Sequence, residues 1–508
     1  MVSSGVERLV YTEDVGGSIP SLPIALMFTI TVALPLVGSL LTYLLPSESK
    51  YGRFVALSFS TVTLLVCVDL WCAFDDSLGG YQFTNTAAFL PSLGVSLGIG
   101  VDGISFLFLL LNSFLVPICL LSSWDSIKYR AKEYFALFRM MEGFVNLVFI
   151  TTDRLVFYLA FEMVLIPMFL VVGHWGSRER KVRASYFFFR YTLLGSVPFL
   201  IAILYLRNTQ GTTDIQLLSF VNRSPATEIL LWLAFFASFA VKVPIIPVHI
   251  WLPEAHVEAP TAGSVFLAGI LLKLGTYGLV RLSIPRFPIA TAYFSPMIVT
   301  LCLVAIVYAS FTAIRQTDIK RIIAYASVAH MNITLLGIFS MTIVGISGGV
   351  FQMLAHGVVS GALFLCVGVL YDRYHSRLVS YYGGIAQFIP LYAIVFLGFT
   401  IANIALPGTA NFTGEFLIML GLMNWSTVGT FFSTSGLVLG GAYSLWLLNR
   451  IIYGNVKSGL DYTPDLSDIE KACLFPLFLV ILWIGLYPEP FLASRESASS
   501  LIIVSITL

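Results

Sequence analysis

The sequence predicts an all-α polytopic membrane protein with about 14 transmembrane helices. Of its 508 residues, 58% are hydrophobic and only 11% are charged, and the mean hydropathy is +0.90. A soluble domain carries about a quarter charged residues. Apolar runs of about 20 residues, long enough to cross a hydrocarbon core of roughly 30 Å, recur along the chain. Because an unpaired backbone amide is costly in lipid, such long continuous runs are expected to be helices.

Fourteen apolar segments account for the predicted helices. They are Leu22–Leu45, Phe54–Phe74, Ile104–Ser122, Tyr134–Thr151, Leu155–Gly173, Ala184–Leu206, Ile229–Ile250, Ala262–Leu282, Ala290–Phe311, Ile322–Phe339, Ile346–Leu370, Leu391–Met423, Phe431–Tyr453 and Ala472–Leu486.

Basic residues alternate between the connections. Most Lys and Arg residues, Lys320 and Arg321 among them, follow odd-numbered segments or lie at their ends, although the connection after the seventh has none. Only Arg154, Arg207, Arg223, Arg281 and Arg286 follow even-numbered ones. Basic loops stay on the cytoplasmic or matrix side, and a miscounted helix would scramble the alternation. The pattern therefore favours fourteen spans, with both termini opposite the basic loops.

Prolines interrupt two of the segments. Pro244 and Pro247 follow Lys242 in the seventh, and Leu406-Pro407-Gly408 precedes Glu415 in the twelfth. Since proline removes an amide donor and clashes with the preceding turn, helices 7 and 12 are expected to be discontinuous. Interrupted segments in corresponding positions of two halves point to the ion site of a transporter. Their separation by five helices, an odd number, predicts two inverted five-helix repeats, helices 4–8 and 9–13.

This pattern divides the chain into five parts. Residues 1–20 form a polar N-terminal extension, whose mixed charges are unlike those of a transit peptide. Residues 21–133 hold helices 1–3, residues 134–282 the first repeat and residues 283–453 the second. Residues 454–508 contain a loop, helix 14 and a tail.

Titratable residues inside the apolar segments are the candidate functional residues. They are Glu142, Glu162, Lys242, Lys273, His330, His356 and Glu415, in the fourth, fifth, seventh, eighth, tenth, eleventh and twelfth segments. A charge at the bilayer centre costs about 3 kcal/mol on insertion scales, so each needs a reason. Titratable groups in so many neighbouring spans are what a proton relay requires.

The alternative is that these residues form structural ion pairs or satisfied polar groups. For a lone histidine such as His330 or His356 the structural interpretation is favoured. Glu162, Lys242 and Lys273 lie away from helix ends, where long side chains reach the interface cheaply, and favour function. Arg139 and Arg190 lie near segment ends and are expected to reach the interface or to pair.

No cofactor or metal motif is evident. The six cysteines are scattered without a CxxC pair, and there is no P-loop or strand-linked GxGxxG, so any redox or nucleotide cofactor is expected in another chain. The stretch HIWLPEAHVEAP contains His249, Glu254, His256 and Glu258, but it is not HExxH and Pro253 interrupts it. A loop or re-entrant connection is expected there. A net charge of +1 argues against nucleic-acid binding.

At these residues the sequence resembles the antiporter-like subunits of respiratory complex I. The resemblance is strongest to the plant and algal forms of subunit 4 of the mitochondrial complex. The resemblance runs from about Leu97 to Tyr453. Its motifs are ASFAVKVPIIPVHIWLPEAHVEAPTAGSVFLAGILLKLGTYGLVR, IKRIIAYASVAHMN, LAHGVVSGALFLCVGVLYDR, ALPGTANFTGEF and GAYSLWLLNR. Arg190 stands where related sequences usually have an apolar residue.

The resemblance implies a fold of fourteen helices with inverted five-helix repeats, and a role for each candidate residue. The family's charge pair is carried by Glu162 and Lys242, and its other proton-translocating positions by Lys273, His330, His356, Glu415 and Glu142. It further implies a proton-pumping subunit of NADH:ubiquinone reductase (EC 7.1.1.2) without a redox centre or cofactor of its own. The expected partners are other membrane subunits, especially antiporter-like neighbours, and lipids, with cardiolipin a candidate. The expected location is the mitochondrial inner membrane, with the basic loops in the matrix.

On this hypothesis, redox events elsewhere disturb the Glu162/Lys242 pair, Lys242 passes a proton to Lys273, and the histidines pass it towards Glu415. Two alternatives remain open. One is a subunit of a stand-alone sodium/proton antiporter, and the other is a purely structural assembly subunit.

Overall fold

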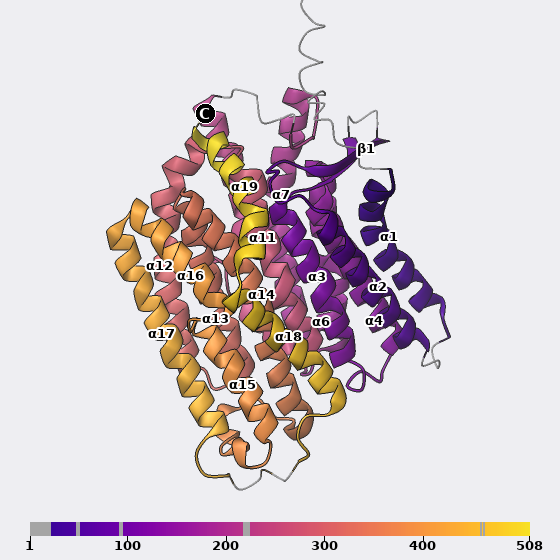
Figure 1. The fold of residues 1–508 in the computed structure, drawn as a ribbon, viewed down its shortest axis with the longest axis vertical. Coiled ribbons are helices and arrows are strands. Elements are labelled where there is room, and N and C mark those ends of the chain that lie inside the picture. Colours follow the sequence, from indigo (N-terminus) through magenta and orange to yellow (C-terminus); the bar gives the residue numbers. More distant parts are fainter. Residues whose placement is uncertain are drawn as a thin grey trace, which may run out of the picture.

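The structure, a computed structural model, describes residues 22–46, 51–90, 95–216, 224–457, 460 and 463–507, so the predicted extension at residues 1–20 lies outside the described part. The helices form a bundle along one long axis (Figure 1). The α-helices are α1 (Leu22–Leu44), α2 (Tyr51–Ala73), α3 (Gly103–Ser122), α4 (Ala131–Ile150), α5 (Arg154–Met163), α6 (Leu165–Trp175), α7 (Lys181–Gln210), α8 (Pro225–Lys242), α9 (Trp251–Glu258), α10 (Thr261–Phe266), α11 (Leu272–Gly278), α12 (Pro288–Arg315), α13 (Ile319–Phe339), α14 (Ile343–Tyr374), α15 (Pro390–Asn403), α16 (Ala410–Trp425), α17 (Thr427–Ile452), α18 (Asp468–Leu486) and α19 (Glu489–Thr507).

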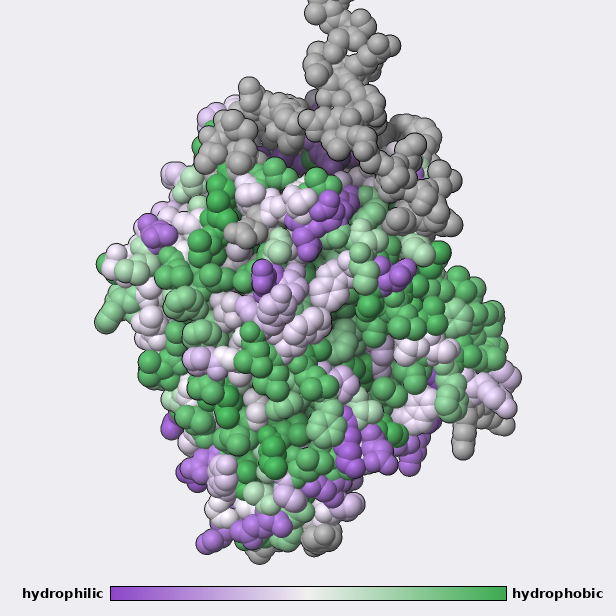
Figure 2. Space-filling view, in the orientation of Figure 1, coloured by the Kyte–Doolittle hydropathy of each residue, from purple (hydrophilic) through white to green (hydrophobic). Residues whose placement is uncertain are grey.

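The membrane character predicted from composition is confirmed. Twelve helical segments in the described part of the chain are long and apolar enough to cross a membrane. Helix also occupies the fourth and twelfth predicted segments, as α4 and as the pair α15 and α16. On the face shown in Figure 2, apolar residues dominate the middle and polar residues gather towards the lower end. The protein is therefore a multi-pass α-helical membrane protein.

Three segments form the interior of the bundle. These are α14, α13 and the segment from Thr261 to Ser283, and nearly all of their apolar residues are buried. By contrast, α1, α2 and α18 expose most of theirs. In Figure 1, α14 lies in the middle of the bundle. Charged groups on these interior segments are therefore shielded from lipid.

Both predicted helix breaks are confirmed. Helix α8 ends at Lys242 and the chain resumes as α9 at Trp251, whose indole donates to the carbonyl of Val241 (2.8 Å). Helix α15 ends at Asn403, and α16 starts at Ala410 after a turn in which Gly408 has φ +90°. Each break leaves backbone groups beside a buried charge, which is where transporters bind ions.

Other features of the backbone were not foreseen. The fifth segment is interrupted at Val164, and the eighth contains two π-helical turns, η3 (Leu267–Leu271) and η4 (Leu279–Ser283), on either side of α11. Apolar sequence alone does not reveal a π-turn, although such turns are frequent at functional sites. Short 3₁₀ turns, η5 and η6, occupy Val379–Tyr381 and Ile385–Gln387.

A hairpin and a last helix complete the described fold. Strand β1 (Gln82–Leu90) pairs antiparallel with β2 (Val95–Val101), and lies across one end of the bundle, as Figure 1 shows. Helix α19 packs on α3 and α14. We call the end with the hairpin the hairpin face. The opposite end, with the connections that follow odd-numbered segments, is the basic-loop face.

Candidate functional site

The first buried pair joins the ends of two helices. Lys242, the last residue of α8, places its Nζ atom 3.7 Å from a carboxylate oxygen of Glu162, near the end of α5. The ammonium group donates to the carbonyl of Phe161 (2.9 Å) and lies over the Phe161 ring. Only 4% of the lysine side chain and 15% of the glutamate side chain are exposed. The charge of Lys242 is thus held by a carboxylate, a carbonyl and a ring face.

The second contact joins α11 to α14. The Nζ atom of Lys273 lies 2.8 Å from Nδ1 of His356, and it also donates to the carbonyl of Ala268. Both side chains are buried. Gly269 and Gly357 bring the helices together, since a Cβ added at Gly357 would lie 2.9 Å from the Gly269 carbonyl oxygen. Small residues of this kind let membrane helices approach closely.

The third contact joins α13 to α16. Nδ1 of His330 lies 3.0 Å from Oε1 of Glu415, one turn after the break that precedes α16. The same oxygen accepts a hydrogen bond of 3.0 Å from the side-chain amide of Gln352 on α14. All three residues are buried. Gln352 was not singled out from the sequence, because an amide inside an apolar helix carries no charge to mark it.

The two histidines connect the second contact to the third. The rings of His330 and His356 lie 5.7 Å apart, centroid to centroid. A water molecule that bonded to a nitrogen of each ring would connect them. The order along the bundle is therefore Lys273, His356, His330, Glu415, which sharpens the predicted order by placing His356 first. We call Glu162, Lys242 and these four residues the central series.

Between Lys242 and Lys273 the backbones pack closely. A Cβ added at Gly275, two residues after Lys273, would lie 3.1 Å from Cβ of Lys242. The two ammonium groups bond to different residues. Lys242 donates to Phe161, and Lys273 contacts Ala268 and His356. A proton moving between them would therefore need water.

Glu142 lies in a pair of its own. It forms an ion pair with Arg139, one turn earlier on α4, and both side chains are completely buried. The structure thus brings six of the seven predicted residues together in neighbouring contacts and gives Glu142 a separate partner. Of the two arginines expected either to reach the interface or to pair, Arg139 pairs with Glu142, whereas Arg190 is exposed and lies over the Tyr186 ring.

Two further buried titratable residues were missed or misplaced. Lys320, which the sequence pattern assigns to the basic connections and the segment ends beside them, is only 1% exposed and donates to the carbonyl of Ala259 (2.9 Å) and to Ser264 Oγ (3.2 Å). His256 is fully buried against Phe364, with a ring separation of 4.7 Å. Lys320 does lie at a helix end, since α13 begins at Ile319, but its burial was not predicted, and it follows from the packing of α13 against α9.

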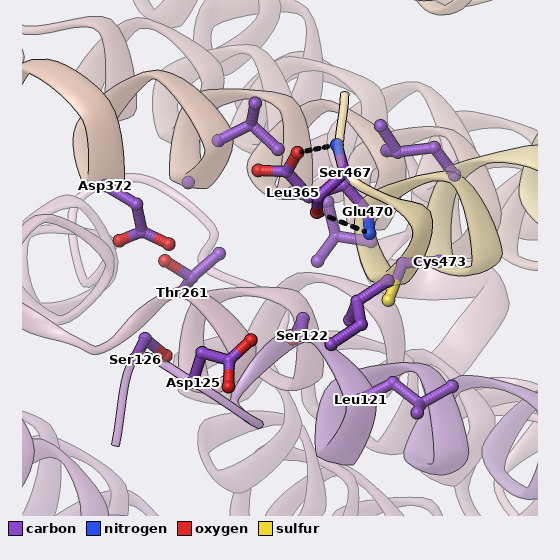
Figure 3. A pocket seen from close by; sticks show the side chains of 14 residues that line it. Leu121, Ser122, Asp125, Ser126, Thr261, Leu365, Asp372, Ser467, Glu470 and Cys473 are labelled. Atoms are coloured by element: carbon purple, nitrogen blue, oxygen red, sulfur yellow. Dashed lines mark hydrogen bonds between the residues drawn. The ribbon is translucent and has the colours of Figure 1, made fainter. Parts of the chain in front are cut away.

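An acidic cavity opens near the basic-loop face. Its volume is about 200 Å³, and the ends of α3 and α14 and the starts of α10 and α18 line it. Asp125, Asp372 and Glu470 face into it together with Thr261 (Figure 3). Glu470 is also held by Arg373, with contacts of 2.6 and 2.8 Å. Thr261 lies one turn before Ser264, which binds Lys320.

Comparison with known proteins places this arrangement in a class. A family model described as NADH:quinone oxidoreductase/Mrp antiporter, TM matches residues 151–440. Among solved structures, a chain of respiratory complex I from Thermus thermophilus with bound NADH superposes with a TM-score of 0.87 at 30% identity, covering 94% of this chain and 99% of that one. A chain of the Mrp complex from Dietzia gives a TM-score of 0.84 at 20% identity, covering 95% and 99%, and shares the fold. The fold and the buried series define an antiporter-like membrane subunit.

The sequence relatives narrow the class. NADH-ubiquinone oxidoreductase chain 4 of Marchantia polymorpha is 50% identical over 92% of this chain and 95% of its own length. Its counterpart in Prototheca wickerhamii is 51% identical over 91% of each chain, and NADH-quinone oxidoreductase subunit M of Rhodobacter capsulatus is 46% identical over 87% and 89%. The chain belongs to the NADH-ubiquinone oxidoreductase chain 4 family.

Proposed function

We propose that this chain is a proton-translocating membrane subunit of mitochondrial NADH:ubiquinone oxidoreductase, and that protons move along its central series. Electron transfer takes place in other subunits and drives the movement. The observation that carries the proposal is the run of neighbouring contacts from Lys273 through His356 and His330 to Glu415. Buried groups with exchangeable protons, placed within reach of one another, are the minimum that proton transfer requires.

The Glu162/Lys242 pair is suited to act as the switch. Two unit charges about 4 Å apart attract by roughly 4 kcal/mol at an effective dielectric near 20. Moving one proton against 100 mV requires about 2.3 kcal/mol. Drawing Glu162 away from Lys242 therefore changes the free energy of the lysine proton by enough to drive one transfer. The interruption at Val164 and the break after Lys242 give both helix ends room to move.

Each histidine accepts a proton at one ring nitrogen and releases the proton of its other ring nitrogen. The Lys273 ammonium group gives a proton to Nδ1 of His356, whose Nε2 proton leaves towards His330. Among the described residues, Nε2 of His330 has no hydrogen-bond partner and is free to accept it. Nδ1 of His330 then gives its own proton to Glu415. Each ring ends neutral, with its proton on the other nitrogen, so one proton is moved. Both rings must return to the starting tautomer before the next proton can follow.

Proton uptake is proposed at the basic-loop face. The acidic cavity admits water, and Thr261 and Ser264 continue the polar lining towards Lys320 and His256. Both ring nitrogens of His256 lack partners within the described part of the chain, which suits a site that water occupies. This orientation places the basic loops in the matrix, where they also meet anionic lipid headgroups such as cardiolipin.

We also propose that residues 134–282 and 283–453 form inverted repeats around the central series. The break between α8 and α9 and the break between α15 and α16 lie in corresponding helices of the two. A charged residue of the central series lies beside each break. Lys242 precedes the first break, and Glu415 follows the second.

Lys242→Ala in the assembled complex tests the proposal. We expect NADH-driven proton pumping in proteoliposomes to be abolished and coupled quinone reduction to be slowed, while the complex still assembles. Wild-type pumping would refute the role of the central series. Sodium-dependent flux without NADH would favour a stand-alone antiporter, and loss of assembly without a selective pumping defect, seen also for Glu162→Gln, Lys273→Ala and Glu415→Gln, would favour a structural subunit.

A further inference from the structure

A second polar line leaves Lys273 in another direction. Tyr277 and Arg281 follow Lys273 at intervals of four residues, from α11 into η4, and so lie along one side of the same helix. This line runs towards the hairpin face, away from His356 and Glu415. A proton on Lys273 could in principle escape along it without passing the histidines. The structure shows how that escape is closed.

Tyr277 stands in a dry aromatic collar. Only 2% of the residue is exposed, and the rings of Phe108, Phe149 and Phe157 surround its own, at centroid distances of 6.0, 5.1 and 6.3 Å. Its hydroxyl group donates to the carbonyl of Phe149 (3.4 Å) and also bonds to the side chain of Ser105, next to Asp102. Around Tyr277 the packing is therefore aromatic, and the polar contact through Ser105 leads to Asp102 and Arg281.

Arg281 blocks the line one turn further on. Its guanidinium group lies 3.0 Å from Oδ2 of Asp102, donates through Nε to the Tyr81 hydroxyl (2.8 Å) and covers the Tyr81 ring at 4.1 Å. Asp102 is fully buried, and its other oxygen accepts from the backbone amide of Ser105 (2.9 Å). Oδ2 itself accepts no hydrogen bond among the described residues and faces only the guanidinium group, so a proton arriving from Lys273 would meet a carboxylate that is already paired with a fixed positive charge.

The charge of Arg281 adds to this closure. A guanidinium group stays charged at any physiological pH, and a fixed arginine in a narrow pore excludes protons and cations. The hairpin holds the arrangement in place, because the Gly98 carbonyl on β2 accepts from the amide of Thr152 (2.9 Å) and Tyr81 lies at the start of the hairpin.

We propose that Arg281, paired with Asp102, is a barrier that prevents protons from leaking between Lys273 and the hairpin face. The barrier directs a proton on Lys273 towards His356 and the rest of the central series. The inference rests on the proposed function for the role of Lys273, but the barrier itself is measurable without NADH.

The test is passive proton conductance of the assembled complex in proteoliposomes, measured after a pH jump with valinomycin and without NADH. Arg281→Met frees a buried carboxylate as a proton acceptor, and we expect a several-fold rise in conductance. With NADH, the pH gradient should fall while electron transfer is not slowed. Arg281→Lys keeps the charge and should remain closed. Arg281→Met combined with Asp102→Asn removes the acceptor and should also remain closed.

Arg286→Met is the matched control. Arg286 is buried near the same end of the bundle, but it binds Gln210 (3.0 Å) and lies outside the line, so its loss should leave conductance unchanged. Arg281→Gln can still bond to Asp102 and Tyr81 but carries no positive charge. It repeats the test with less disturbance of the packing, and because the charge is lost it should leak as Arg281→Met does.

Wild-type conductance in an assembled Arg281→Met or Arg281→Gln complex would overturn the barrier. So would an Arg281→Lys complex, or the double variant, that leaks as much as Arg281→Met. If both neutral variants failed to assemble while the double variant assembled, the pair would be structural and the proposal wrong. None of these outcomes touches the proposed function, which Lys242→Ala tests separately.

Discussion

The Nζ atom of Lys273 lies 2.8 Å from Nδ1 of His356, although 83 residues separate them in the sequence. The contact joins two of the most deeply buried segments of the bundle, in the part of the molecule where an unpaired charge is most costly. It is also the point at which the lysine part of the central series meets the histidine part. The predictions below begin with it.

His356→Leu should interrupt the series at this contact. A hydrogen bond to a charged group contributes about 1.5–3 kcal/mol, and about 1.4 kcal/mol corresponds to a tenfold change in an equilibrium, so we expect pumping to fall by roughly tenfold or more. Pumping is measured by dye quenching in proteoliposomes and normalised to assembled complex. His249→Leu is the control, since His249 is buried beside Tyr308 and outside the series. Equal losses in the two variants would show a general packing defect.

Gln352→Leu should weaken the end of the series without removing a charge. Among the described residues, Glu415 has two side-chain partners, and the variant would remove Gln352 and leave His330. The loss of about 1.5 kcal/mol or more shifts the proton equilibrium between His330 and Glu415 by roughly tenfold. We expect slower pumping in a complex that assembles normally. Normal pumping in the variant would show that Glu415 does not depend on Gln352.

Gly357→Ala should separate the helices that bring Lys273 and His356 together. The added Cβ would lie 2.8 Å from a methyl carbon of Leu111 and 2.9 Å from the Gly269 carbonyl oxygen. Overpacking of this kind costs about 1–3 kcal/mol. Thermal stability of the complex and pumping should both fall.

Gly361→Ala, one turn along the same helix, is the matched control for Gly357→Ala. Its Cβ would lie 3.4 Å from Val265, at ordinary contact distance. We expect near-normal stability and pumping. If the two alanine variants behaved alike, the close approach at Gly357 would not be what positions Lys273.

Arg139→Leu should destabilise the subunit by leaving Glu142 buried without its partner. Breaking a buried pair in this way costs about 3–5 kcal/mol. We expect less assembled complex on native gels, and recovery when Glu142→Leu is added. Pumping by the recovered double variant then decides the role of Glu142. Normal pumping would leave Glu142 with a structural role, and lost pumping would give it a role in proton transfer.

Much of the fold follows from the sequence because its causes are local. A run of apolar residues is enough to predict a helix across the membrane, and the runs from Leu22 to Leu486 all coincide with helix. The breaks after Lys242 and before Glu415 follow from proline and glycine, which act on the turns next to them. The π-turns around Lys273 have no such local mark. The interruption at Val164 has one that the sequence prediction overlooked, because Pro167 cannot donate to the carbonyl of Met163, where α5 ends.

The sequence by itself determined which segments are helical, where two of them break, and which titratable groups the membrane interior contains. Only the tertiary structure decided which of these groups meet. In it, His356 precedes His330 in the series and Gln352 bonds to Glu415. Lys320 is buried, and Glu142 pairs with Arg139. The physical reason is that a side chain's partner depends on the rotation and packing of helices far apart in the chain. Hydropathy fixes that a helix lies in the membrane, but not which of its faces turns towards which neighbour.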